Sequence, residues 1–316
     1  NMKKVSVIVP CYNSSSYIER SVNSLINQTL DDIEILLIDD GSTDDTLSKL
    51  KEYEKRYKNK IKVVALEKNG GLGNARNVGM KKSTGEYIGF VDSDDYVDKE
   101  MFEEMYNKAK ATDSDVVECD FMWEYPNKNR IDSGIEYSKG KDMLINVRVM
   151  ACNKIYKREW LNKIKPQFAV GLKYEDVLFT YQYVPYVNKI EFVHKNFYHY
   201  IQRSTSLANH QTKRVREIYE ILNQVEEYYK KKKIYNNYKE ELEYLFTRYI
   251  LGSSYKRACK IKDKETRKEV LKEGWVFLNQ KYPNWKKSKY LKKGLKNKYF
   301  KMLNYAFYNI NTIFFR

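Results

Sequence analysis

Residues 87–95 have the sequence YIGFVDSDD, in which a short apolar run leads directly into a cluster of aspartates. A continuous apolar run of this length is typical of a strand that is buried on both faces of a sheet. Three earlier runs have the same character, at Val5–Val9, Ile33–Ile38 and Ile61–Leu66. Together with Tyr87–Val91 they predict four buried strands.

Amphipathic stretches at Ser16–Gln28, Thr43–Tyr57 and Leu72–Lys82 lie between these runs, and we interpret them as helices. Alternating strands and helices predict an α/β fold with a parallel, doubly wound sheet. Such sheets bind ligands beyond the carboxyl ends of their strands. We therefore expect the functional site in the residues that follow each apolar run.

The pattern changes further along the chain. Strand-like stretches at Asp115–Phe121, Lys189–Val193 and Phe197–Ile201 are mixed with helix-like stretches at Asp142–Val149 and Glu175–Tyr183. From His210 onward the pattern is helical only. We expect an α/β catalytic domain over residues 2–210 and a basic helical region over residues 211–316.

The net charge of +16 lies in the last third of the chain. Residues 211–316 hold 27 Lys and Arg against 11 Asp and Glu, whereas residues 1–210 hold 31 of each kind. Residues 281–316 carry ten basic side chains and no acidic one. This asymmetry indicates an anionic partner, either a membrane surface or a polyanionic acceptor, and a homo-oligomeric contact stays open.

The last segment has an apolar stripe with helical spacing, and most of its lysines lie off the stripe. The stripe comprises Leu291, Leu295, Tyr299, Met302, Ala306, Ile310 and Ile313. A basic amphipathic helix that ends in Phe314 and Phe315 suits an anionic membrane surface. The alternative, equally open, is a stripe that packs on the protein's own helices while its lysines face water.

The composition indicates a globular protein, with 42% hydrophobic residues, 29 Tyr and 13 Phe. No apolar stretch approaches the roughly 18 residues that a membrane-spanning helix needs, and we expect no signal peptide. The four scattered cysteines have no metal-site or disulfide spacing, which indicates free thiols. We therefore expect a cytoplasmic protein, at the inner face of the cell membrane if its basic region binds there.

Polar clusters follow all four predicted strands, at Pro10–Asn13, Asp39–Asp44, Asn69–Asn77 and Asp92–Asp95. Acidic groups at one edge of a sheet repel one another, and a cation is the natural compensation. Hard oxygen ligands favour Mg²⁺ or Mn²⁺, which complete their shell with phosphate oxygens. A metal and an arginine beside a diphosphate suit a reaction that expels a nucleoside diphosphate, because negative charge grows on that leaving group.

Five motifs in this order resemble family 2 glycosyltransferases with the GT-A fold, similar to bacterial polysaccharide and wall-teichoic-acid glycosyltransferases. They are VSVIVPCYN (5–13), ILLIDDGSTDDT (35–46), NGGLGNARNVG (69–79), YIGFVDSDD (87–95) and KYEDVLF (173–179). The resemblance implies an inverting, metal-assisted transfer of a sugar from a UDP-sugar to an acceptor hydroxyl. The acceptor would be a saccharide, a lipid-linked saccharide or an anionic cell-envelope polymer.

The resemblance also implies which residues bind the nucleotide: Pro10, Tyr12, Asp40, Asn69, Arg76, Asp92, Ser93, Arg203 and Ser206. Tyr12 would lie near the base, and Asp40 would accept the uracil N3–H in a charge-assisted bond. Thymine also has an N3–H, so dTDP-sugars stay open. Arg76 would help to hold the phosphates, as would Arg203 further along the chain.

For the metal, the resemblance implies Asp94 as a direct ligand of Mn²⁺ or Mg²⁺, with Asp92 near the ribose or the metal. His210 would approach the metal, although a plain surface position explains His210 equally well. Asp39 and Asp44 are better explained as turn and cap residues.

Asp176 would be the general base, which takes the proton of the acceptor hydroxyl as the oxygen attacks the anomeric carbon. Glu175 would position the acceptor or the base. A single in-line displacement inverts the anomeric centre, and one base is enough because the diphosphate leaves without protonation. The structural alternative for Asp176 is an acid at a helix start, stabilised by the helix dipole.

Two other functions stay open. A catalytically inactive GT-A-like protein would bind nucleic acid or another polyanion through its basic region, but the acidic clusters would repel phosphate, so we expect no nucleic acid. A nucleotidyltransferase would need a glycine-rich basic loop after the first strand, where Pro10–Asn13 stand. The glycines at 70, 71 and 73 do not form a dinucleotide-binding loop, since Arg76 occupies the position of the third glycine.

Overall fold

The structure is a computed structural model that describes residues 3–203 and 211–310. The chain forms two compact units, Asn1–Arg203 and Ser204–Arg316, and each is considered by itself. The domain boundary expected at residue 210 falls within residues 204–210, which lie outside the described ranges.

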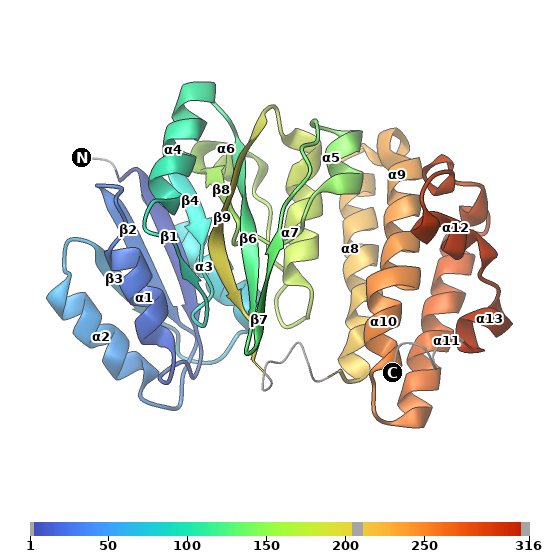
Figure 1. Cartoon of the computed structure of the whole chain (residues 1–316), viewed down its shortest axis with the longest axis horizontal. Coiled ribbons are helices and arrows are strands. Elements are labelled where there is room, and N and C mark those ends of the chain that lie inside the picture. The colour runs from blue at the N-terminus through green and yellow to red at the C-terminus, as the bar shows by residue number, and fades with distance from the viewer. Residues whose placement is uncertain (1–2, 204–210, 311–316) are drawn as a thin grey trace. The chain divides into compact units, whose positions relative to one another are not determined.

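The first unit is built on one nine-stranded sheet (Figure 1). In spatial order its strands are β3 (Ile61–Ala65), β2 (Ile33–Asp39), β1 (Val5–Cys11), β4 (Tyr87–Phe90), β8 (Lys154–Lys157), β6 (Val116–Tyr125), β9 (Ile190–Ile201) and β5 (Tyr96–Val97), and β7 (Lys128–Asp132) pairs with β6. The first four are parallel, whereas β8 is antiparallel to both of its neighbours. Every residue of β1, β2 and β4 is buried, which explains their continuous apolar runs. The predicted α/β class is confirmed, but the sheet is parallel only over its first four strands and mixed beyond β4. The carboxyl ends of β1, β2 and β4 meet at one edge.

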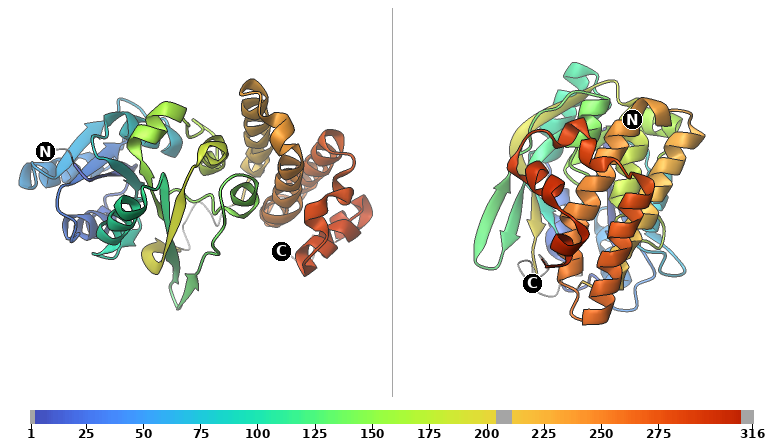
Figure 2. Two further views of the ribbon diagram at one scale, coloured as in Figure 1. Left: turned by 90° about the horizontal axis from the view of Figure 1, so that it is seen from above. Right: turned by 90° about the vertical axis from the view of Figure 1, so that its right-hand side faces the viewer.

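Helices cover both faces of this sheet (Figures 1 and 2). They are α1 (Ile18–Ile26), α2 (Thr46–Arg56), α3 (Leu72–Lys82), α4 (Met101–Thr112), α5 (Lys141–Asn146), α6 (Arg158–Ile164) and α7 (Glu175–Tyr183), followed by the 3-10 turn η1 (Val184–Tyr186). The bounds predicted for α3 and α7 agree with the structure. Helix α4 was not predicted, although Met101, Met105 and Ala109 recur at helical spacing and are buried.

The two strands predicted at residues 189–193 and 197–201 form one continuous strand, β9. It runs parallel to β6, with shifts in register between Cys119 and Phe121. Exposed His194 and Lys195 interrupt the apolar pattern at this irregularity, so the pattern breaks although the strand does not.

Gly79 of α3 lies directly against Ile8 of β1. A β-carbon at position 79 would lie 2.3 Å from Cγ2 of Ile8, and a β-branched side chain has little freedom to turn away. We expect Gly79→Ala to lower the free energy of unfolding by about 1–3 kcal/mol, measured by urea denaturation. Lys82→Ala, on an exposed position of the same helix, is the control, and equal stability of the two variants would contradict the close packing.

The second unit is helical throughout its described residues, which confirms the predicted class. Its elements are η2 (Lys213–Arg216), α8 (Glu217–Lys231), α9 (Tyr235–Arg248), α10 (Ser254–Cys259), α11 (Lys264–Lys281), η4 (Trp285–Lys287), η5 (Lys289–Leu291), α12 (Leu295–Met302) and α13 (Tyr305–Ile310). A π-helical segment, η3 (Tyr249–Ser253), joins α9 to α10. Within residues 3–203 and 211–310, no helix is long and apolar enough to cross a membrane.

The single amphipathic helix predicted near the C-terminus is wrong. Gly294, with φ +90°, starts α12, and the chain leaves the helical conformation again between α12 and α13. The predicted stripe is divided as well, because Leu291 is fully buried while Leu295 and Met302 are exposed. Residues 311–316, which include Ile313, Phe314 and Phe315, lie outside the described residues.

Candidate active site

The ends of β1 and β2 form the first part of the site. Tyr12 follows β1 and is 46% exposed, so its side chain is accessible to a ligand, whereas Pro10 is buried within the strand. Asp40 follows β2, and its two carboxylate oxygens accept hydrogen bonds from the backbone N–H groups of Gly70 (2.9 Å) and Gly71 (2.8 Å). Burial raises the pKa of Asp40 and these two bonds oppose the rise. Each oxygen keeps a lone pair with which to accept a further donor.

The loop before α3 and the end of β4 border this region. The Asn69 side chain is exposed, and its Oδ1 accepts from the backbone N–H of Gly71 at 3.1 Å. Ser93, after β4, shares a 2.9 Å hydrogen bond with the hydroxyl of Ser14, after β1. The neighbouring strand ends are therefore tied together by side chains.

Arg76 joins three acidic side chains that are far apart in the sequence. One terminal nitrogen, Nη1, donates to Glu175 at 2.9 Å and to Asp176 at 2.5 Å, and Nη2 donates to Asp92 at 2.8 Å. The arginine side chain is only 2% exposed. The phosphate contact expected of Arg76 stays a prediction; in the structure its buried guanidinium binds carboxylates through both terminal nitrogens and so organises the acids.

Glu175 and Asp176 are the first residues of α7, and both have raised pKa values. Burial raises the pKa of Glu175, as does the charge of Asp176 beside it, while Arg76 lowers it. Burial also raises the pKa of Asp176, against the charge of Arg76. The two side chains are still 15% and 19% exposed, so a substrate hydroxyl has access to them. Raised carboxyl pKa values in an accessible cluster are typical of acid–base chemistry.

The three aspartates after β4 have different partners. Asp92 binds Arg76, whereas Asp94 forms an ion pair with Arg203, whose guanidinium also lies 4.0 Å from the ring centroid of Tyr17. Burial and the charge of Asp92 raise the pKa of Asp94, and Arg203 opposes this.

Asp95 stabilises the loop after β4 by binding β9. Its carboxylate accepts from the hydroxyl of Tyr198 at 2.6 Å and from the backbone N–H of Ile201 at 2.8 Å, both on β9. Tyr198 in turn accepts from the backbone N–H of Asp92 at 3.2 Å. Asp95 therefore fastens the loop after β4 to the sheet, a role that was not predicted from the sequence.

Comparison with known proteins gives this site a family. Residues 6–167 match Glycosyl transferase family 2, which is half of the chain. The chain belongs to this family. Glycosyltransferase GlyG of Streptococcus pneumoniae serotype 4 is 30% identical over 224 residues, which cover 64% of this chain and 72% of GlyG.

Two further comparisons show how far the similarity of this glycosyltransferase extends. EpsJ of Bacillus subtilis, named an uncharacterized glycosyltransferase, is 46% identical over 117 residues, 37% of this chain and 33% of EpsJ. The crystal structure of TarS from Staphylococcus aureus superposes with a TM-score of 0.69 and 27% identity, covering 89% of this chain and 49% of that chain. The chain thus spans a third of EpsJ and about half of TarS.

The donor atoms of this family 2 glycosyltransferase suit a hard divalent cation. Within the described residues no group of three or more His, Cys, Asp and Glu is arranged to hold a metal. Mg²⁺ and Mn²⁺ sites at phosphates need only one or two protein carboxylates, because substrate oxygens and water complete the shell. Asp94 is partly exposed, and its pKa is raised by burial and then by the nearby charge of Asp92, of which a cation would relieve the second. His210 and Ser206 lie outside the described residues.

Asp39 and Lys154 lie beside the site of this glycosyltransferase, and neither was predicted as functional. Oδ1 of buried Asp39 has no hydrogen-bond partner among the described residues, so the turn role does not account for the whole side chain. Asp44 does act locally: burial raises its pKa, but its carboxylate accepts hydrogen bonds from Thr46 and Ser15, which together lower the pKa to about 2.

Lys154 is the second missed residue. Its fully buried ammonium donates to the backbone carbonyls of Arg148 (2.6 Å) and Met150 (2.8 Å). These bonds shape the segment in which the backbone N–H of Ala151 donates to Oδ2 of Asp176 at 3.3 Å. A lysine at the start of the short strand Lys154–Lys157, next to Ile155 and Tyr156, was the available signal, since charged residues are buried only with partners.

Proposed function

We propose that this glycosyltransferase moves a sugar from a UDP-sugar to an acceptor hydroxyl, with inversion and with Asp176 as general base. The observation that carries the proposal is the cluster of Asp92, Glu175 and Asp176 around buried Arg76. Glu175 and Asp176 are accessible and have raised pKa values, and the exposed Tyr12 side chain and the Asp40 carboxylate, which follow strands of the same sheet, support the proposal.

In the proposed reaction the carboxylate of Asp176 takes the proton of the acceptor hydroxyl. The acceptor oxygen forms a bond to the anomeric carbon while the bond from that carbon to the diphosphate oxygen breaks, and UDP leaves with the electron pair. Arg76 and the backbone N–H of Ala151 hold the two oxygens of Asp176, so the base is oriented before the substrate arrives.

Asp94, with Asp92 beside it, would hold Mn²⁺ or Mg²⁺ in this proposal. When bound, the cation supplies positive charge to the departing diphosphate. Arg203, now paired with Asp94, is a second cation at the same carboxylate. The chain's own contribution is to keep both acids fixed through their arginine partners.

The relatives support a nucleotide-sugar donor and a cell-envelope acceptor. TarS of S. aureus, named a poly(ribitol-phosphate) beta-N-acetylglucosaminyltransferase, is 36% identical over 211 residues, and its residues 1–349 have been crystallised with UDP-GlcNAc. A poly(ribitol-phosphate) beta-glucosyltransferase of Bacillus spizizenii is 35% identical over 167 residues, which are 26% of that protein. We therefore propose a UDP-hexose or UDP-N-acetylhexosamine as donor and a saccharide or anionic polymer of the envelope as acceptor.

Calorimetry with nucleoside diphosphates tests the donor. We expect UDP to bind in the presence of Mn²⁺, and Asp40→Asn to weaken this binding by about 10–100-fold, because a hydrogen bond to a charged acceptor is lost. Asp45→Asn, an exposed aspartate of the same loop, is the matched control and should leave binding intact.

CDP provides a second comparison, because cytosine has no N3–H to donate to Asp40. Equal affinity for UDP and CDP would contradict the proposed recognition of the base. Salt-sensitive binding of DNA without binding of any nucleoside diphosphate would instead favour an inactive polyanion-binding protein.

A further inference from the structure

The outward side of α12 in the second unit exposes large apolar side chains. Leu295 is 87% exposed and Met302 is 70% exposed. Seven residues are close to two helical turns, so these two side chains point in directions roughly 20° apart. Phe300, which is 1% exposed, holds the opposite side of α12 against the unit. The exposed pair is therefore a fixed surface feature.

Exposed lysines lie beside this apolar pair. Lys298 and Lys301 are exposed on α12, and residues 281–316 hold ten basic side chains without an acidic one. Helix α13 extends the apolar surface with Tyr305 and Phe307, which are 43% and 37% exposed. The ring of Phe307 lies 6.5 Å from that of Tyr299 on α12, so the two helices present neighbouring side chains.

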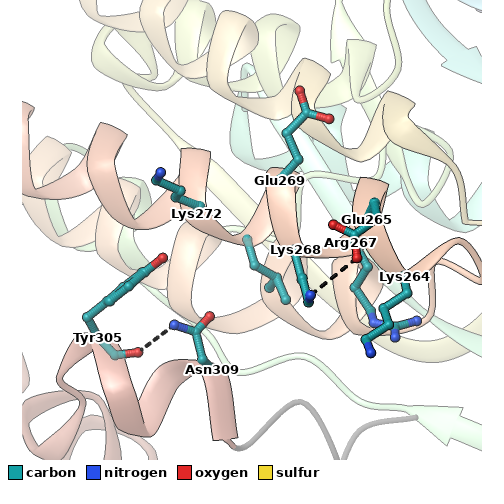
Figure 3. Close-up of a pocket in the computed structure, with 9 residues that line it drawn as sticks. Lys264, Glu265, Arg267, Lys268, Glu269, Lys272, Tyr305 and Asn309 are labelled. Carbon is teal, nitrogen blue, oxygen red and sulfur yellow. Dashed lines mark hydrogen bonds and ion pairs between the residues drawn. The ribbon is translucent and has the colours of Figure 1, made fainter.

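A groove between α11 and α13 adds further positive charge (Figure 3). Lys264, Lys268 and Lys272, one helical turn apart, line its α11 side, and Tyr305 and Asn309 line its α13 side. Its volume is about 600 Å³. Lys268 pairs with Glu265 at 3.2 Å, whereas Lys264 and Lys272 have no carboxylate partner among the described residues. Tyr305 belongs to both the groove and the exposed apolar surface.

We propose that the α12–α13 face, defined as Leu295, Lys298, Lys301, Met302, Tyr305 and Phe307 together with the lysine-lined groove, binds the surface of an anionic lipid membrane. Apolar side chains among lysines fit the boundary between headgroups and acyl chains. The lysines that lack a carboxylate partner in the described part of the chain attract acidic headgroups.

Charge and exposure favour an anionic membrane over two other partners, a hydrophilic polyanion and a second copy of the chain. A hydrophilic polyanion, such as a phosphate-bearing acceptor chain, would satisfy the lysines but would gain nothing from Leu295 and Met302. A second copy docked symmetrically through α12 and α13 would bring like charge against like charge, since residues 281–310 contain no acid and the acids of the face, Glu265 and Glu269, lie in the groove on α11. The membrane accounts for both features, and it does not depend on the donor proposed above.

Co-sedimentation of the full chain with lipid vesicles tests the proposal. We expect binding to phosphatidylcholine vesicles that contain phosphatidylglycerol, and much weaker binding to pure phosphatidylcholine. Leu295→Ser/Met302→Ser keeps every charge and should weaken binding on the order of tenfold, because the inserted apolar area is lost. Lys298→Gln/Lys301→Gln should weaken it by about tenfold or more.

Lys55→Gln/Lys58→Gln is the matched control, because it removes the same charge from exposed positions of the first unit. It should bind vesicles as the parent does. Equal losses in the control and in Lys298→Gln/Lys301→Gln would overturn the proposal, since net charge alone would then explain binding. Unchanged binding of Leu295→Ser/Met302→Ser would overturn it as well, and circular dichroism establishes that each variant is folded.

Two further outcomes would assign the face to another partner and so overturn the proposal. The first is binding of inorganic polyphosphate, weakened by Lys264→Gln/Lys272→Gln, with no binding to phosphatidylglycerol vesicles. The second is a dimer in sedimentation equilibrium that Leu295→Ser/Met302→Ser converts to a monomer.

Discussion

Asp176→Asn is expected to lower kcat for sugar transfer by about 10²–10⁴-fold, the usual contribution of a general base. Asparagine keeps the shape of the side chain and can still accept the hydrogen bond from Ala151, but it cannot take a proton. The measurement is release of UDP coupled to formation of the glycoside, with UDP affinity determined by calorimetry on the same samples. Unchanged affinity shows that the site is intact.

Glu175→Gln is the matched control for this experiment. Glu175 also binds Arg76 and also begins α7, so the two variants remove equivalent charges from one cluster. We expect the smaller loss of kcat from Glu175→Gln. A large loss in this variant with near-normal turnover of Asp176→Asn would exchange the roles of the two acids.

The pH dependence follows from the raised pKa of Asp176. A general base acts in its ionised form, so kcat/KM should fall as the pH falls through this pKa, which burial keeps above the ordinary value of 3.8. The acidic limb should therefore appear at a higher pH than a solvated aspartate would give. The small residual activity of Asp176→Asn should lack this limb, and its persistence would assign the titration to another group.

Arg76→Met is expected to lower the free energy of unfolding by about 3–5 kcal/mol, because three carboxylates lose a buried cation. Urea denaturation measures the loss. Lys110→Met, which removes a half-exposed lysine from Glu86, is the control and should cost about 0–1 kcal/mol. Equal losses in the two variants would contradict the structural role of Arg76.

The loss in Arg76→Met should also depend on pH. Without the guanidinium, the carboxyl pKa values rise further in the folded protein, which then holds more protons than the unfolded chain. The free energy of unfolding therefore falls as the pH rises through these values, so the loss is larger at about pH 8 than at about pH 5. Adding Asp176→Asn to Arg76→Met should recover part of the stability, since one unpaired charge disappears.

Most of the fold could be predicted because buried parallel strands require continuous apolar runs, and the acids that follow these runs necessarily meet at one edge. Contacts between distant residues could not be predicted. Arg76 looked available for phosphate because its partners Glu175 and Asp176 lie 99 and 100 residues further along the chain.

The C-terminal stripe was misjudged for a different reason. Helical spacing was counted across Gly294, where the backbone has φ +90° and begins a new helix. The glycine was the signal available in the sequence, since this conformation is costly for any residue with a side chain.

The loop after β4 contains three aspartates of identical chemistry, and its exact length decides what each of them does. Asp95 holds the loop to β9, Asp92 meets Arg76, and Asp94 stays within reach of solvent beside Arg203. Inserting or deleting one residue in this loop would move another aspartate into the position of Asp95, which holds the loop, or of Asp94, the proposed metal ligand. If Asp94 holds the cation as proposed, the spacing within this loop matters more for sugar transfer than the number of acids does.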